Sequence, residues 1–434
     1  MTIREPAAEV RRIHPPDTAF HAAVRVPGDK SLSHRALILA AMASGVSEVS
    51  GLGPGADVAA TLRAVRSFGV DIRGTRMVSS GVTNWTSSPG PVDCGNSGTT
   101  MRLLAGALAG RSTPTTLVGD ASLMRRPMGR LVGPLGSLGA EVTLAGGDTA
   151  PVTVVALGPL VGADVTIPMA SAQVRTAFAF AALQAHGVST IDGPGGFRDH
   201  TERWLEAFGL GRWLGDGTAY RIEPGPVPAG RYSLPGDPSS AAFLWASAAI
   251  RRGSSVETED ISLNPGRIGF LQVLEAMGAE VGAEVTRDLG GDPVGRVWVR
   301  GRGLRGTEVS GVLTAAALDE LPLVAVLGAY AEGMTTVRDA GELRAKESDR
   351  IATTVEMIRQ LGGGAEATDD GFAVVGTGWL EEGTVDAAGD HRIAMAAAVA
   401  ATGATGPVTI AGSDAAAVSW PSFFDDVEAM WSSR

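Results

Sequence analysis

Five segments of the chain place apolar residues at helical spacing and close on an apolar residue followed by glycine, as in "LRAVRSFG" and "FLQVLEAMG". A glycine directly after the last apolar position is typical of a helix C-terminus at which one residue adopts the left-handed backbone conformation. The closing glycines lie 70, 70, 69 and 84 residues apart, at Gly69, Gly139, Gly209, Gly278 and Gly362. This regular spacing indicates a structural repeat.

A second kind of segment, small and rich in alanine, precedes each of these, and a further copy lies near the C-terminal end. The six Ala-rich segments run into Gly45, Gly110, Gly187, Gly253, Gly333 and Gly403. They are apolar on nearly all sides, which predicts interior helices, and short β-rich stretches follow most of them. Six such units predict two domains of three units each.

Polar residues stand where each interior helix is expected to begin. The six openings are Lys30-Ser31, Asn96 to Thr99, Ser171 to Gln173, Asp237 to Ser240, Asp319-Glu320 and Asp390 to Arg392. Helix capping accounts for such residues, and we favour it for the fourth opening. Capping does not explain the basic residues just inside four of the helices, where the helix dipole disfavours cations: Arg35, Arg102, Arg175 and Arg392. A bound anion would remove the conflict, so we expect several helix N-termini to meet a ligand with more than one acidic group.

Composition narrows the class of protein. A chain of 434 residues is long enough for two domains, and its net charge of −11 argues against nucleic-acid binding. The single cysteine, Cys94, excludes an intrachain disulfide and a multi-cysteine metal site. The N-terminus carries charges where an export signal needs an apolar core, and the apolar runs are too short to span a bilayer. We therefore expect a soluble cytoplasmic protein.

Lysine is rare in this chain. Among 36 Lys and Arg residues, only Lys30 and Lys346 are lysines. Such a bias suggests two positions where a compact ammonium does what a guanidinium cannot, although chance survival at the surface is an equal alternative. Helical spacing in "ELRAKESDRIATTV" predicts that Lys346 and Arg350 share a helix face, with Glu347 to one side. An exposed, salt-bridged face is the usual meaning of such a run.

Two further basic positions are candidates for anion contacts. Arg125 and Arg126 precede a proline, which predicts a helix beginning at Met128 and makes Arg126 the better candidate. Arg198 stands ahead of a repeat helix, where a ligand contact and a surface position are equally open. The "GDKS" motif lacks the glycines of a nucleotide-binding P-loop, so that reading is excluded.

Eight segments together resemble the EPSP synthases, the 3-phosphoshikimate 1-carboxyvinyltransferases. They are "VPGDKSLSHRAL", "DCGNSGTTMRLL", "GDASLMRRPM", "ASAQVRTAF", "PGDPSSAAF", "DELPLVAV", "LRAKESDRI" and "GDHRIAMAAAVA". The resemblance implies a two-domain inside-out α/β barrel of six βαβαββ repeats, three per domain. The domains would be 28–235 and 1–27 plus 236–434, with the active site in the cleft between them.

The resemblance also implies an activity. The enolpyruvyl group of phosphoenolpyruvate would move to the 5-hydroxyl of shikimate 3-phosphate, releasing phosphate by addition and elimination. No metal or organic cofactor would take part. The partners would be these two small molecules, with no nucleic acid and no membrane, and the family suggests a monomer.

The family's site residues can be carried over position by position. Shikimate 3-phosphate would lie against Ser31, Arg35, Ser171, Ala172, Gln173 and Arg198. Phosphoenolpyruvate would lie against Gly98, Arg126, Arg350 and Arg392, with Asn96 supporting the loop. Lys30 and Lys346 would contact both ligands, and His391 is included among the substrate-binding residues.

Two carboxylates would share the proton transfers, which is feasible when their surroundings tune their pKa values. Asp319 would take the proton of the hydroxyl and Glu347 would serve the methyl carbon, with Lys30 and Lys346 as supporting ammonium groups. The chain departs from the family at Val418, near a position where many members carry lysine. It departs again at Gly195 and Gly196, where a phosphate-binding serine is common.

Three alternatives stay open. One is a UDP-N-acetylglucosamine enolpyruvyltransferase, although "GDASLMRRPMG" lacks the reactive cysteine of that group. Another is a non-catalytic phosphometabolite-binding protein. The third, a relative of the RNA 3′-phosphate cyclases, is disfavoured by the acidic net charge.

Overall fold

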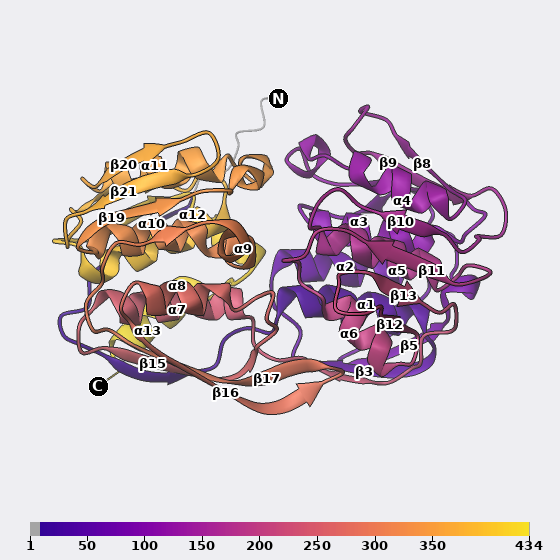
Figure 1. The fold of residues 1–434 in the computed structure, drawn as a ribbon, viewed down its shortest axis with the longest axis horizontal. Coiled ribbons are helices and arrows are strands. Elements are labelled where there is room, and N and C mark those ends of the chain that lie inside the picture. Colours follow the sequence, from indigo (N-terminus) through magenta and orange to yellow (C-terminus); the bar gives the residue numbers. More distant parts are fainter. Residues whose placement is uncertain (1–8, 434) are drawn as a thin grey trace. The chain divides into compact units, whose positions relative to one another are not determined.

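A computed structural model describes residues 9–433 of the chain. The chain divides into two compact units, shown in Figure 1. The N-terminal unit comprises residues 27–235 and 287–294. Of the described residues, the C-terminal unit comprises 9–26, 236–286 and 295–433. Each unit is described by itself.

The N-terminal unit contains three pairs of an inner and an outer helix, each pair associated with a four-stranded sheet. The inner helices are α1 (Lys30–Met42), α3 (Gly98–Leu108) and α5 (Ala172–Ala182), and the outer ones are α2 (Ala56–Ser67), α4 (Val132–Ser137) and α6 (His200–Ala207). The sheets have the orders β14-β3-β5-β4, β6-β7-β9-β8 and β10-β11-β13-β12. One pair in each sheet is parallel and the other two are antiparallel, so the three sheets repeat one topology.

The strands of these three sheets are short. The first sheet uses β3 (Ser44–Ser50), β4 (Asp71–Arg73), β5 (Arg76–Ser80) and β14 (Arg231–Ser233). The second uses β6 (Val92–Asp93), β7 (Thr115–Val118), β8 (Ala140–Leu144) and β9 (Val152–Ala156). The third uses β10 (Asp164–Thr166), β11 (Ser189–Asp192), β12 (Gly211–Trp213) and β13 (Tyr220–Ile222).

The C-terminal unit repeats this plan with one change. Its inner helices are α7 (Pro238–Ile250), α10 (Leu321–Tyr330) and α12 (His391–Ala400), and α8 (Gly269–Ala276), α9 (Gly311–Ala316), α11 (Arg350–Gln360) and α13 (Phe423–Trp431) complete its α-helices. Two sheets have four strands, in the orders β16-β17-β15-β2 and β18-β19-β21-β20. The third sheet has three strands, because β1 pairs with β23 in place of the usual antiparallel hairpin.

The strands of the C-terminal unit have the following bounds. They are β1 (Val10–Ile13), β2 (His21–Val24), β15 (Ser255–Ser262), β16 (Glu280–Leu289), β17 (Asp292–Arg300), β18 (Glu308–Val309), β19 (Gly333–Val337), β20 (Gly364–Ala367), β21 (Phe372–Gly376), β22 (Gly383–Asp386) and β23 (Val408–Ala411). The ends of β16 and β17 continue past the unit boundary, and residues 287–294 belong to the N-terminal unit.

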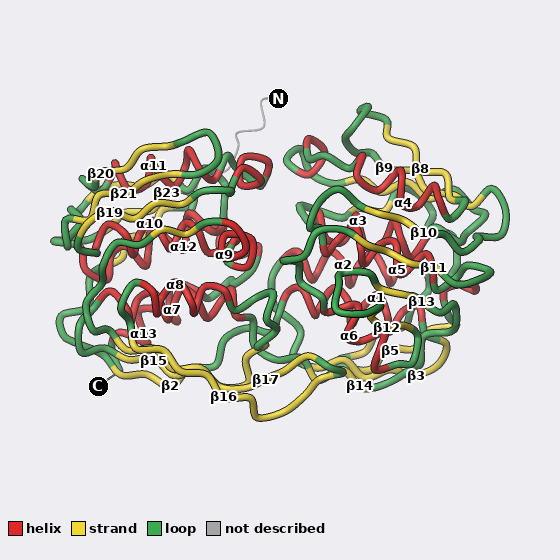
Figure 2. Tube along the Cα trace, in the orientation of Figure 1, coloured by secondary structure: helices red, strands yellow, loops and turns green. Residues whose placement is uncertain are grey.

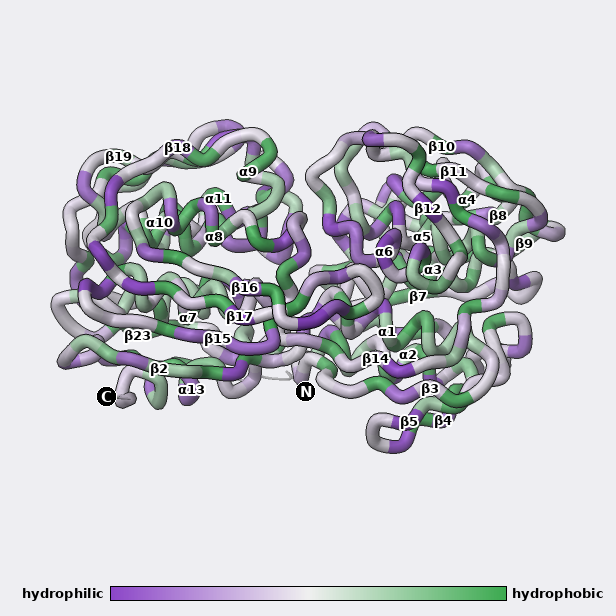
Figure 3. Tube along the Cα trace, turned by 60° about the horizontal axis from the view of Figure 1, so that its bottom comes forward, coloured by the Kyte–Doolittle hydropathy of each residue, from purple (hydrophilic) through white to green (hydrophobic). Residues whose placement is uncertain are grey.

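Each unit has its own hydrophobic core, and the Ala-rich helices lie inside it. In Figure 2 the helices of each unit are bordered by strands, and Figure 3 shows hydrophobic residues along these helices. Every residue of α10 is buried, as is every residue of α7 before its last. The small side chains explain this packing, because alanine and glycine let neighbouring helices approach closely.

The repeat glycines close the outer helices as the pattern predicts. Gly69 and Gly362 have φ angles of 87° and 74°, a conformation that costs glycine little and other residues more. The predicted two-part α/β repeat fold is therefore confirmed. Within residues 9–433, helices are too short or too polar to cross a bilayer. The predicted lack of an export signal concerns residues 1–16, of which 1–8 lie outside this range.

Candidate active site

The start of α1 carries the first of the two lysines. Asp29 caps the helix by accepting a hydrogen bond from the Leu32 amide at 2.8 Å. Lys30 follows as the first helical residue, and its Nζ lies 3.2 Å from Oδ2 of Asp57 at the start of α2. The Lys30 side chain is 23% exposed, so its ammonium is both held by a carboxylate and accessible. Ser31 follows it and is half-buried.

Arg35, one turn further along α1, is buried. Its Nε donates to Thr201 Oγ1 at 2.8 Å, its Nη2 to Thr176 Oγ1 at 3.0 Å and its Nη1 to the Ser31 carbonyl at 3.0 Å. Burial lowers the pKa of Arg35 to about 10. The negative charges of Glu202, Asp29 and Asp292 oppose this shift, and the positive charge of Arg198 adds to it. A bound anion would relieve both effects, so the structure gives Arg35 and Arg198 a shared reason to bind one.

The start of α3 is held by polar side chains of two loops. Ser97 caps the helix, and Gly98 is its first residue. Arg126 Nη2 donates to Asn96 Oδ1 at 2.6 Å, while Asn96 Nδ2 donates to Asp120 Oδ2 at 2.6 Å. A Cβ added to Gly98 would lie 3.6 Å from Arg126 Nη1, so the Gly98 backbone and this guanidinium are neighbours.

The helix predicted to begin at Met128 starts one residue later, as the 3₁₀ turn Gly129–Leu131 that runs directly into α4. Short 3₁₀ turns cover Leu123–Arg125 and Gly129–Leu131, and Arg126 between them has extended backbone, with φ −76° and ψ 144°. Arg126 lies three residues before the second of these turns and meets the α3 start through its side chain. The nearest helix, α4, begins at Val132.

The start of α5 is tied to α3. Ser171 caps α5 by accepting from the Val174 amide at 3.4 Å, and Ala172 is the first helical residue. Gln173 donates to Thr99 Oγ1 at 2.9 Å and accepts from Arg102 Nη1 at 2.7 Å. The two helix starts therefore keep a fixed spacing through one amide side chain. Arg198 is half-buried in the loop before α6.

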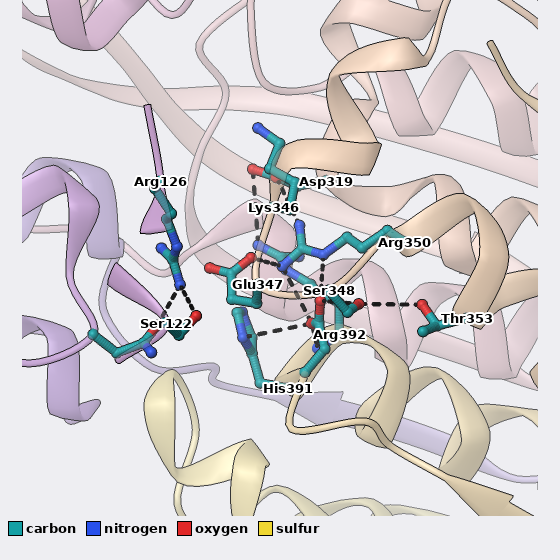
Figure 4. A network of polar contacts seen from close by, with 12 residues as sticks. Ser122, Arg126, Asp319, Lys346, Glu347, Ser348, Arg350, Thr353, His391 and Arg392 are labelled. Carbon is teal, nitrogen blue, oxygen red and sulfur yellow. Dashed lines mark hydrogen bonds and ion pairs between the residues drawn. The ribbon is translucent and has the colours of Figure 1, made fainter. Parts of the chain in front are cut away.

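In the C-terminal unit, carboxylates surround one buried guanidinium (Figure 4). Arg350 Nη2 donates to Glu347 Oε2 at 2.6 Å, its Nε to Asp390 Oδ2 at 2.8 Å and its Nη1 to Asp319 Oδ1 at 3.4 Å. Burial alone would lower the pKa of Arg350, but the negative charges of these carboxylates outweigh it and raise the pKa. The predicted catalytic pair, Asp319 and Glu347, thus shares one permanent cation.

Arg392 and His391 begin α12 beside this group. Arg392 Nη1 donates to Glu320 Oε1 at 3.4 Å, and its Nη2 lies 4.0 Å from Asp319 Oδ2. His391 Nδ1 lies 3.9 Å from Oδ1 of Asp390, the residue that caps α12. The C-terminal unit therefore brings Asp319, Glu347, Arg350, His391 and Arg392 into one network.

Lys346 differs from the predicted geometry. The helix begins at Arg350, because Asp349 caps it by accepting from the Ile351 and Ala352 amides, both at 3.1 Å. Lys346 lies before the cap with an extended backbone, so the predicted shared helix face with Arg350 is wrong. Its Nζ donates to Glu342 Oε1 at 3.0 Å, and the Lys346 side chain is 24% exposed.

Sequence reasoning did not single out several residues that hold the site together. Asp57 lies in the first turn of the outer helix α2, far from Lys30 in sequence. The residues around Asp57 give no indication of its ion pair with Lys30. Thr176 and Thr201 look like ordinary helix residues in the sequence, and only the structure shows that both hydroxyls accept hydrogen bonds from Arg35. In the sequence Asp390 fits an ordinary helix cap, and only the structure shows that its carboxylate is buried and bonded to Arg350.

Two units of three α/β repeats, with cations and carboxylates gathered where the inner helices begin, define a class of protein suited to small anionic compounds. The family model described as EPSP synthase (3-phosphoshikimate 1-carboxyvinyltransferase) matches residues 15–427. The 3-phosphoshikimate 1-carboxyvinyltransferase of Alkalilimnicola ehrlichii is 44% identical over 94% of this chain and 93% of its own. That of Herpetosiphon aurantiacus is 43% identical over 93% of this chain and 96% of its own.

Solved structures agree with these matches. An EPSP synthase structure from Acinetobacter baumannii has a TM-score of 0.84 and 35% identity, covering 96% of this chain and 97% of its own. The enolpyruvyl transferase NikO from Streptomyces tendae, with a TM-score of 0.76 and 18% identity over 98% of each chain, shows the shared fold alone. The chain belongs to the EPSP synthase family, so the resemblance read from its eight segments is confirmed.

Proposed function

We propose that the chain transfers the enolpyruvyl group of phosphoenolpyruvate to the 5-hydroxyl of shikimate 3-phosphate, giving 5-enolpyruvylshikimate 3-phosphate and phosphate. The observation that carries this proposal is 44% identity to a 3-phosphoshikimate 1-carboxyvinyltransferase across 94% of the chain. The charges described above support it, because both substrates carry a phosphate and a carboxylate.

We assign shikimate 3-phosphate to residues of the N-terminal unit. Arg35 has five N–H hydrogens and uses three on Ser31, Thr176 and Thr201, which leaves one on each of Nη1 and Nη2. Two such hydrogens suit a carboxylate, whose two oxygens accept them together. Ser171, Ala172, Gln173 and Arg198 complete the proposed set, and the lack of a serine at Gly195 and Gly196 leaves more of the phosphate binding to Ser171 and Arg198.

We assign phosphoenolpyruvate to cations of both units. Arg126 and the Gly98 amide, supported by Asn96, serve it from the N-terminal unit. Arg350 and Arg392 serve it from the C-terminal unit, with His391 next to them. Lys30 and Lys346 contact both substrates in this assignment. The raised pKa of Arg350 keeps its charge at every physiological pH, which an anion-binding residue requires.

The proposed chemistry needs a proton delivered to the methylene carbon, removal of the hydroxyl proton as the oxygen attacks C2, and removal of a methyl proton as phosphate leaves. Glu347 donates and later removes the proton at the methyl carbon, and Asp319 takes the hydroxyl proton. Both carboxylates contact Arg350, which fixes their orientation, and both are partly exposed, with side-chain exposures of 17% and 19%. Lys30 stabilises the negative charge that develops between the substrates.

The direct test measures phosphate release from phosphoenolpyruvate in a coupled assay with two separate acceptors. Release with shikimate 3-phosphate and none with UDP-N-acetylglucosamine supports the proposal. Release with only the UDP-sugar would assign the chain to the other enolpyruvyl transfer. No release with either acceptor, but saturable binding of phosphoenolpyruvate, would leave a binding protein.

We further propose that the reaction runs without a metal or organic cofactor and that the active species is a monomer. Dialysis against a chelator should leave the rate of phosphate release unchanged. Sedimentation at assay concentrations should give the mass of one 434-residue chain.

A further inference from the structure

Adjacent residues of α1, His34 and Arg35, lead into two different hydroxyl networks inside the N-terminal unit. Both side chains are buried, with residue exposures of 0% and 2%. Neighbours on a helix point about 100° apart, so each one reaches different helices. His34 reaches α2 and Arg35 reaches α5 and α6.

The Arg35 network uses two buried threonines. Arg35 Nε donates to Thr201 Oγ1 and Nη2 donates to Thr176 Oγ1. The two hydroxyls lie 2.6 Å apart, and Thr176 donates its own hydrogen to the Ala172 carbonyl at 2.8 Å. Because Thr176 has spent its hydrogen, Thr201 must be the donor between them. Both hydroxyl hydrogens are therefore used, and the donor order runs from Thr201 to Thr176 to the Ala172 carbonyl. This order fixes the plane of the Arg35 guanidinium relative to the start of α5.

The His34 network runs the other way, to the start of α3. His34 Nδ1 lies 2.7 Å from Thr61 Oγ1, which lies 2.6 Å from Thr100 Oγ1. Thr100 donates from its hydroxyl to Ser97 Oγ at 2.8 Å, with the Asp57 carbonyl oxygen a longer second acceptor at 3.5 Å, and its amide donates to Ser97 Oγ at 3.1 Å. With Thr100 donating to Ser97, Thr61 donates to Thr100 and His34 donates from Nδ1. The network ends on Ser97, the residue before Gly98.

Burial and the neighbouring cations Lys30 and Arg35 lower the pKa of His34 well below its usual value, so the ring is neutral. A neutral ring has one N–H, and the donor order above places it on Nδ1. Its Nε2 is buried and has no hydrogen-bond partner in the described part of the chain, as expected for a nitrogen without hydrogen in a packed interior.

We propose that these two networks position the two substrates separately: Thr176 and Thr201 orient Arg35 toward shikimate 3-phosphate, whereas His34, Thr61 and Thr100 set the loop at Ser97 and Gly98 for phosphoenolpyruvate. This proposal rests on the proposed function. The five residues are positioning residues, because each acts through Arg35 or through the α3 start. The prediction is therefore a split between the two KM values.

The experiment compares Thr201→Val and Thr100→Val in steady-state kinetics with each substrate varied in turn. Thr201→Val leaves a buried guanidinium hydrogen without its acceptor, so KM for shikimate 3-phosphate should rise about tenfold while KM for phosphoenolpyruvate stays within about twofold. Thr100→Val removes a neutral hydroxyl, so KM for phosphoenolpyruvate should rise about fivefold with little change for shikimate 3-phosphate. Thr201→Ser and Thr100→Ser keep the hydroxyls and should restore each value.

The matched control is Thr116→Val. Thr116 and Thr153 form a hydroxyl pair of 2.9 Å between β7 and β9 of the same unit, and neither belongs to the proposed site. This variant should leave both KM values unchanged. If Thr201→Val does not fold, Thr176→Val removes the other hydroxyl acceptor of Arg35 and carries the same expectation.

Three outcomes would overturn the proposal. They are equal changes in both KM values for each valine variant, no change in either KM, and failure of the serine variants to restore the values. Absence of turnover in the unmodified chain would instead refute the proposed function.

A second readout needs no turnover. ¹⁵N spectra of the six histidines, with the His34 signal assigned by the variant His34→Asn, should show the Nδ1–H tautomer of His34. An Nε2–H tautomer or an imidazolium at neutral pH would contradict the donor order.

Discussion

Arg35 and Arg350 are the same residue type, both buried in their own unit, yet their pKa values move in opposite directions. Arg35 donates to hydroxyls and a carbonyl, and burial lowers its pKa although the negative charges of Glu202, Asp29 and Asp292 oppose it. Arg350 is surrounded by three carboxylates, which outweigh burial. The difference teaches that the N-terminal unit leaves the charge of Arg35 only partly compensated, which suits the proposed anionic substrate. The C-terminal unit instead uses Arg350 to gather Asp390 with Asp319 and Glu347, the two carboxylates proposed to move protons.

The largest effect is expected from the carboxylates around Arg350. Glu347→Gln should lower kcat about a hundredfold to ten-thousandfold, because the variant keeps a hydrogen-bonding side chain but cannot transfer the proton. The measurement is kcat at saturating substrates. Glu356→Gln, an exposed carboxylate on α11 that accepts from Gln360, is the matched control and should keep full activity. Normal turnover in Glu347→Gln would remove the proposed division of labour between the units.

Stability should separate the two arginines. Arg350→Met leaves Asp390 buried without its cation and should cost about 3–5 kcal/mol in the free energy of unfolding. Arg35→Met leaves two threonine hydroxyls that still bond each other, so its cost should be nearer ~1–2 kcal/mol. Urea titration of both variants gives the two values. Adding Asp390→Asn to Arg350→Met should recover part of the loss, and equal costs for the two methionine variants would contradict the comparison.

The pH dependence of the free energy of unfolding tests the ion pair between Asp390 and Arg350 separately. Burial tends to raise the pKa of Asp390, but the charges of Arg350 and His391 outweigh it, and the pKa is lowered. A carboxyl whose pKa falls on folding stabilises the protein above its unfolded value of about 4, and this stability is lost as the pH falls through the folded pKa. Asp390→Asn should therefore flatten the acid limb of a stability profile below about pH 4. An unchanged acid limb would show that the ion pair does not stabilise the fold.

A smaller and more selective effect is expected at Gly98. An alanine Cβ would come within 2.9 Å of Arg102 Nη1 and 3.6 Å of Arg126 Nη1. Arg102 must shift while keeping its bond to Gln173, so Gly98→Ala should raise KM for phosphoenolpyruvate about fivefold and change the binding of shikimate 3-phosphate little. Calorimetric titration with shikimate 3-phosphate alone checks the second part. Equal losses for both substrates would indicate a general disturbance of α3.

The sequence pattern was sufficient for the repeat and for most helix ends. Gly69 and Gly362 close their helices with positive φ because capping is decided by a few adjacent residues. The basic residues of the helix starts were visible for the same reason. Local rules failed at α11, which Asp349 caps after Lys346, and they did not distinguish the 3₁₀ turn Gly129–Leu131 from the α-helix that follows it.

Contacts between distant segments could not be predicted from spacing. Asp57 meets Lys30 across 27 residues, and Thr201 meets Arg35 across 166. Such pairs depend on how helices pack in three dimensions, and neither partner carries a local mark of the other. The family resemblance identified the candidate substrate-binding residues. The residues that orient their side chains could be identified only from the structure.

The central claim is that the N-terminal unit holds Arg35 as a buried and only partly compensated cation for shikimate 3-phosphate. Calorimetric titration of shikimate 3-phosphate into the unmodified chain and into Arg35→Met measures this directly. The account predicts that affinity falls at least about a hundredfold in the variant, because a bidentate charge-assisted contact is lost, while thermal unfolding stays cooperative. Equal affinity in the two proteins would contradict it.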